Sequence, residues 1–148
     1  MMWLSRTSND AKKQLSKWVS SGNEGDRPLV LCRGRIGNNY GLRAGNLLED
    51  GKCRIGYGGK QHLVATSGVL INWFDRSFTW VAKDLLGSQM EPVLDYNGQT
   101  NYDANGYPVC RGTYQSNTYA GYVFGDKCVI GVDDREEGLS NYEVLALN

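Results

Sequence analysis

Four polar residues lie in turns that recur in the two halves of the chain. Lys52 and Lys127 occupy matching places 75 residues apart, and aligning the proline-ended turn of each half places Asn23 opposite Asp103. A carboxylate or amide oxygen accepts hydrogen bonds and an ammonium group donates them, so such a pair can bridge two neighbouring hydroxyl groups. An ordinary solvated turn is the simpler explanation of each residue alone. Recurrence in both halves strengthens the case for a binding site, although a purely structural turn would recur as well.

Catalytic chemistry has weaker support in the sequence. His62 is the only histidine and so the only histidine base for a Ser or Cys nucleophile, and Glu137 takes its place in the second half. The acidic run at 133–137 could supply two carboxylates for glycoside hydrolysis, but such a run is usually a solvated turn. The stretch GYGGK at 56–60 fits neither GxxxxGK[ST] nor GxGxxG. We therefore expect no catalytic residues and no enzymatic activity.

The composition limits the fold and the partners. The 148 residues suit one domain, and 16 basic side chains balance 16 acidic ones. A balanced charge favours neither nucleic acid nor an anionic membrane surface as partner. Nineteen Gly, three Pro, nine Tyr and four Trp suit short strands joined by tight turns better than a helical bundle.

The cysteines and the first residues bear on the compartment. No stretch approaches the ~20 apolar residues of a membrane-spanning helix, and none near the start has the apolar run of a secretion signal. We therefore expect a cytoplasmic protein, released by an unconventional route if it meets ligands outside the cell. Buried free thiols are the favoured interpretation of the four cysteines. The alternative is a bridge inside each half, Cys32 to Cys53 and Cys110 to Cys128. With no C-x-x-C pair and one histidine, a zinc site is not expected.

The chain contains two copies of one unit. The 75-residue offset aligns K-C-R-I-G with K-C-V-I-G, while offsets of 78 and 77 align L-C-R-G with V-C-R-G and W-L-S-R with W-V-A-K. We expect one domain, 1–148, made of tandem repeats at 1–72 and 73–148. Short apolar runs separated by Gly, Asn and Asp predict an all-β body with pseudo-two-fold symmetry, sandwich-like or compact and barrel-like. One short helix is predicted within residues 9–19, with Asn9 or Asp10 as N-cap.

The order and spacing of four short motifs resemble the DM-nine repeat family. These motifs are C-R-G, G-K-C, Y-G-G-K-x-H and N-Y-E-V-L. The chain is similar in particular to small two-repeat members of molluscs and parasitic flatworms, over essentially its whole length. The resemblance implies a β-rich, often homodimeric protein with mannose-binding lectin activity, linked to innate recognition of microbial glycans. It also implies that the sugar is held without a metal ion or other cofactor.

In the lectin members, an Asp before the Cys-Arg strand and the Lys of Gly-Lys hold the sugar. The resemblance carries these roles to Asn23 and Lys52 in the first copy and to Asp103 and Lys127 in the second. Asn23 departs from the pattern, since an amide is a weaker acceptor than a carboxylate, and the first copy reads S-G-V-L where the second reads Y-E-V-L. We expect a lectin for mannose-type glycans. The alternative is an intracellular interaction or stress-response module that keeps the fold without sugar binding.

Overall fold

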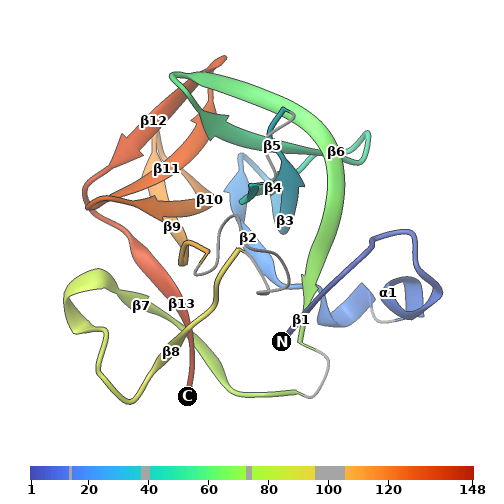
Figure 1. Cartoon of the computed structure of the whole chain (residues 1–148), viewed down its shortest axis with the longest axis horizontal. Helices are drawn as coiled ribbons and strands as arrows, with labels where there is room; N and C mark the ends of the chain where they lie inside the picture. Colours follow the sequence, from blue (N-terminus) through green and yellow to red (C-terminus); the bar gives the residue numbers. More distant parts are fainter. Residues whose placement is uncertain (14, 38–40, 73–74, 96–105) are drawn as a thin grey trace.

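A computed structural model of the chain describes residues 1–148 except 14, 38–40, 73–74 and 96–105 (Figure 1). The elements of the first copy are β1 (Met2–Leu4), α1 (Asn9–Lys13), η1 (Leu15–Lys17), β2 (Ser20–Glu24), β3 (Arg27–Arg35), β4 (Leu42–Leu47), β5 (Lys52–Tyr57) and β6 (Lys60–Ile71). Those of the second copy are β7 (Phe78–Ala82), η2 (Lys83–Leu85), β8 (Glu91–Pro92), β9 (Val109–Tyr114), β10 (Asn117–Phe124), β11 (Lys127–Val132), β12 (Arg135–Leu139) and β13 (Glu143–Leu147).

The first copy forms a closed set of four antiparallel strands. β3 pairs with β4, β4 with β5 and β5 with β6. The 12-residue β6 then curves far enough for its second half to pair with β3, which closes the set. Figure 1 shows β6 running along one whole side of the molecule.

The second copy repeats this arrangement with one break. β9, β10, β11 and β12 pair in chain order, and β13 pairs with β9. Adding the 75-residue offset to β6 gives 135–146, so β12 and β13 together are its counterpart, interrupted at residues 140–142. The outer strands match as well, because Trp3 of β1 pairs with Leu70 and Trp80 of β7 pairs with Leu145.

The two copies meet through equivalent residues. A Cβ atom on Gly56 would lie 2.2 Å from the Ile130 carbonyl oxygen, and one on Gly131 would lie 2.6 Å from the Ile55 carbonyl carbon. Both positions therefore require glycine, because the backbones approach too closely for any side chain. Exchanging one copy for the other reproduces the contact, as pseudo-two-fold symmetry requires.

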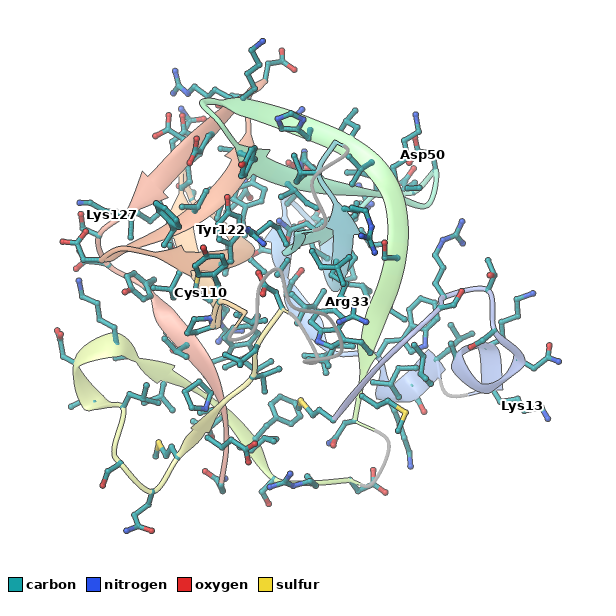
Figure 2. The ribbon with its side chains drawn as sticks, viewed as in Figure 1. Lys13, Arg33, Asp50, Cys110, Tyr122 and Lys127 are labelled. Carbon is teal, nitrogen blue, oxygen red and sulfur yellow. A yellow bond between two sulfur atoms is a disulfide. The ribbon has the colours of Figure 1, made fainter. Side chains whose placement is uncertain are left out.

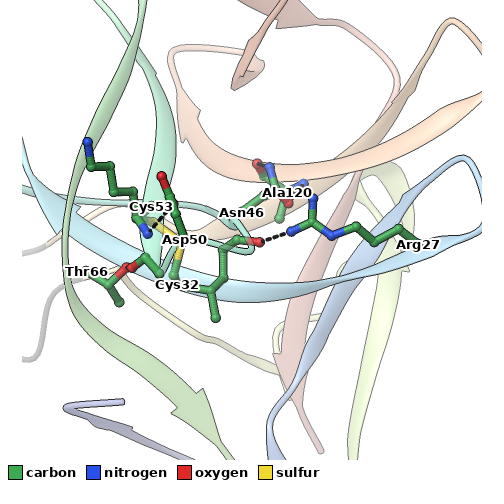
Figure 3. Close-up of a disulfide and its surroundings, with 10 residues drawn as sticks. Arg27, Cys32, Asn46, Asp50, Cys53, Thr66 and Ala120 are labelled. Carbon is green, nitrogen blue, oxygen red and sulfur yellow. Dashed lines mark hydrogen bonds between the residues drawn. A yellow bond between two sulfur atoms is a disulfide. The ribbon is translucent and has the colours of Figure 1, made fainter. Parts of the chain in front are cut away.

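A disulfide closes each copy. Cys32 bonds to Cys53 (Figure 3). Cys110 bonds to Cys128, the Cα atoms are 5.9 Å apart in both pairs, and the described chain has no free cysteine. The favoured expectation of free thiols is therefore wrong, and the alternative pairing is confirmed. The strand pairing explains the bridge of the first copy. Cys32 and Cys53 both lie on strands that pair with β6, and all four cysteines are fully buried.

The all-β prediction is confirmed, and the closed strands make a barrel-like core with outer strands rather than a flat sandwich. One detail of the predicted helix is wrong. The Ser8 hydroxyl accepts the Ala11 amide at 3.1 Å, so Ser8 is the N-cap in place of Asn9 or Asp10. None of the helices in the described ranges is long and apolar enough to span a membrane.

Candidate functional site

A groove of about 740 Å³ runs between the two copies. Its walls are Ser20, Gly22 and Asn23 from β2, residues 111–113 of β9, Thr118 of β10, and residues 141–143 at the break between β12 and β13. The lining is predominantly polar, with hydroxyl, amide, carboxylate and guanidinium groups facing one space. A groove of this kind suits a ligand that is itself rich in hydrogen-bonding groups.

β2 forms one wall because it crosses from the first copy to the second. Asn23 pairs in register with Thr118 of β10. Gly22 makes this approach possible, since a Cβ atom there would lie 2.2 Å from the Thr118 carbonyl oxygen. The Asn23 amide nitrogen donates to the Gly25 carbonyl at 3.0 Å, which fixes the side chain at the turn.

A charged pair forms the opposite wall. Arg111 and Glu143 are paired in register on β9 and β13, and Arg111 Nε donates to Glu143 Oε1 at 2.8 Å. The Arg111 guanidinium also lies 4.4 Å from the ring centre of Trp80, so its position is fixed from a second side. Both side chains stay partly accessible, at 27% and 41% of their surface. Each can therefore offer a hydrogen bond to a molecule in the groove.

Two lysines donate hydrogen bonds to Ser140, in the interruption between β12 and β13. Lys127 Nζ donates to Ser140 Oγ, and Lys83 Nζ donates to the Ser140 carbonyl oxygen. Ser140 directly precedes Asn141, which lines the groove. Lys127 therefore does not line the groove itself but supports the segment that leads into its wall.

Tyr142 supplies the aromatic surface of the groove. Lys83 Nζ lies 5.1 Å from its ring centre. Partial burial, followed by the negative charges of Asp126 and Asp84, raises the pKa of the Tyr142 hydroxyl. The hydroxyl therefore remains protonated at neutral pH and can both donate and accept.

The structure brings only part of the predicted site together. Asn23 lines the groove and Lys127 flanks it. Lys52 begins β5, where its backbone amide is bound by Asp50 Oδ1 at 3.0 Å, and it does not line the groove. Figure 2 shows Lys127 and Asp50 on opposite flanks of the molecule. Asp103 lies outside the described residues, so its role stays a prediction, as does that of Lys52.

The sequence analysis missed the residues that dominate the groove, Arg111, Asn141, Tyr142 and Glu143. One signal could have revealed the last three of these, whereas Arg111 lies in the repeated C-R-G motif. The two copies diverge at this point, with T-S-G at 66–68 matching N-Y-E at 141–143. A polar and aromatic substitution in an otherwise repeated strand indicates a requirement that packing alone does not impose.

No protein-family model matches the chain, and no curated protein matches it. The resemblance to the DM-nine repeat therefore stays an expectation from the motifs. Among the residues that the structure describes, no three or more His, Cys, Asp or Glu side chains gather as a metal site would require.

Proposed function

We propose that this protein is a carbohydrate-binding protein and that the groove between its two copies holds the sugar. The Arg111–Glu143 pair is the observation that carries the proposal. A carboxylate acceptor and a guanidinium donor, joined at 2.8 Å and partly open to solvent, match the two neighbouring hydroxyls of a hexose. Because Trp80 and the strand pairing fix the arginine, little side-chain freedom is lost on binding.

The remaining walls complete such a site. The amides of Asn23 and Asn141 can donate and accept at further hydroxyls, and the Tyr142 ring offers an apolar face for sugar C–H groups. Single sites of this open, wet kind bind monosaccharides weakly, so avidity requires several grooves in one assembly. The homodimer that the resemblance implies would supply two.

Mannose-type glycans on microbial surfaces are the proposed ligands, and this choice rests on the resemblance. The proposed binding requires no metal ion, because the donors and acceptors of the groove can hold a diol directly. Chelator therefore should not change binding.

A glycan array, probed with and without chelator, tests the proposal. Wild-type protein should bind mannose-type glycans equally in both conditions. Glu143→Gln, which keeps the side-chain shape and removes the charge, should weaken binding by about tenfold. Glu49→Gln is the matched control, since Glu49 lies outside the groove with 83% of its side chain exposed. Absence of any glycan signal from correctly folded protein would reject the lectin function and leave the interaction-module alternative.

A further inference from the structure

A second pocket, of about 370 Å³, lies where the first copy meets the second on another part of the surface. Four aromatic rings line it, those of Tyr57, Tyr107, Tyr122 and Phe124. It shares no lining residue with the groove. Neither the repeat motifs nor the proposed function accounts for this grouping.

The floor of the pocket is rigid and one wall is open. Tyr122 is 3% exposed, and its hydroxyl donates to the Gly56 carbonyl of the first copy at 2.7 Å. The Tyr107 ring centre lies 5.9 Å from that of Tyr122 and 5.6 Å from that of Phe124. Phe124 itself is 58% exposed at the rim. A ligand that covers Phe124 would remove apolar surface from water.

The pocket also carries one group of each charge. The Arg43 guanidinium lies 4.5 Å from the Tyr107 ring centre and 5.5 Å from that of Tyr122. Glu136 also lines the pocket and accepts the Gly59 amide at 2.5 Å through one carboxylate oxygen. The carboxylate has two oxygens, so it retains capacity to accept further hydrogen bonds.

This combination selects against charged ligands. Aromatic rings alone would favour an organic cation, but Arg43 lies against the Tyr107 and Tyr122 rings and its positive charge disfavours one. Glu136 in turn repels an anion. A neutral ring with an apolar face and several hydroxyls suits both the aromatic wall and the Glu136 acceptor.

We propose that the aromatic pocket is a second carbohydrate subsite, which takes a neutral pyranose whose C–H face lies on Phe124 and whose hydroxyls bond to Glu136. The proposal rests on the proposed lectin function and extends it to a second, independent contact for one glycan.

The pocket is a property of one side of the pseudo-two-fold only. Tyr57 and Glu136 match Val132 and Gln61 at the 75-residue offset. Tyr122 matches Asn46, given that Gly121 and Gly45 make the same close approach to the strand that follows. Two aromatic rings and the carboxylate therefore have no counterpart at the matching positions of the other copy.

Residue-resolved NMR of the ¹⁵N-labelled full chain tests the subsite. The probes are the methyl glycosides of mannose, glucose, galactose and N-acetylglucosamine, with tetramethylammonium chloride as the cation control. The amides of Gly58, Gly59 and Phe124 report on the pocket, and those of Gly112 and Thr113 report on the groove. At least one glycoside should shift the pocket amides saturably, both in wild type and in Glu143→Gln.

Phe124→Ala should weaken that response by about tenfold. Leu85→Ala, a matched truncation of a side chain that is 73% exposed outside both sites, should leave it unchanged. Shifts confined to the groove amides would overturn the subsite while the proposed function stands. Pocket shifts with tetramethylammonium in place of the glycosides would overturn the assignment to a neutral ring. The absence of chemical-shift changes at both sets of amides would overturn both proposals.

Discussion

The matching stretches 65–68 and 140–143 show how one scaffold produces two surfaces. In the first copy, Ala-Thr-Ser-Gly lies within the continuous β6, and a Cβ atom on Gly68 would approach the Leu4 carbonyl oxygen of β1 to 3.2 Å. In the second copy, Ser-Asn-Tyr-Glu breaks the strand and opens to the groove. The strand pairing on either side is the same. Changing four consecutive residues thus supplies one wall of the groove while the flanking strands keep the same pairing.

The two arginines of the C-R-G motifs also share a position but differ in exposure and partners. Arg33 lies 5.0 Å from the Trp3 ring centre and Arg111 lies 4.4 Å from that of Trp80. Arg33 is buried, at 8% exposure, and donates to the Asp95 carbonyl at 3.4 Å. Arg111 is partly open and bonds to Glu143. The stacked arginine is therefore a shared structural element, and only the second copy makes it accessible to a ligand.

Removing either disulfide should give the largest effect and test how equal the two copies are. The bridges span 21 and 18 residues, and the loop-entropy model predicts about 3 kcal/mol of stability from each. Urea unfolding of Cys32→Ala/Cys53→Ala and of Cys110→Ala/Cys128→Ala should therefore show similar losses. Reductant should lower the stability of wild type and leave a variant lacking all four cysteines unaffected. A large loss from one pair alone would show that one copy carries most of the fold.

The two bridges also bear on where the protein works. Buried disulfides persist in oxidising compartments and are rare in the cytosol. The bridges favour an oxidising environment, whereas the first residues predict the cytoplasm, and that location stays a prediction.

Lys52 and Lys127 allow the two copies to be compared by their effect on glycan binding. Lys127 supports the groove through Ser140, whereas the first copy has Ala65 where the second has Ser140. Lys127→Ala should weaken glycan binding about threefold, since an exposed interaction of this kind contributes under about 1 kcal/mol. Lys52→Ala should have no effect on binding at the groove, and neither change should move Tm by more than about 2 °C. Equal losses from both variants would favour the predicted site in each copy over the single groove.

Sequence reasoning predicted what both copies share and missed what joins them. The repeated K-C and C-R-G words predicted strands and matching places, because the same residues meet the same packing problem twice. The groove is different, since β2 of the first copy pairs with β10 of the second and lines the groove together with the broken strand, and neither half alone indicates that arrangement. Asn23 was found because it lies in a recurrent turn. Glu143 and Tyr142 were missed because they have no counterpart in the first copy.

Glu24 provides the smallest and most specific test of the contact between the copies. Its Oε2 accepts from Arg54 of the first copy and from the Tyr119 hydroxyl of the second, each at 3.0 Å. Partial burial acts to raise the pKa of Glu24, but the Tyr119 hydrogen bond and the Arg54 charge together outweigh it and hold the pKa below the ordinary 4.5. A depressed carboxyl pKa stabilises the folded state above the unfolded pKa, and this contribution is lost as pH falls through the folded value.

Glu24→Gln should therefore lower the free energy of unfolding at pH 7, by less than about 1 kcal/mol because the pair is partly solvated. The difference from wild type should shrink as pH falls below 4.5, the ordinary value for this carboxyl. Urea unfolding at a series of pH values measures it, with the exposed Glu49→Gln as control. A difference that persists undiminished at the acid end would mean that the shape of the Glu24 side chain, and not its charge, holds the two copies together at this point.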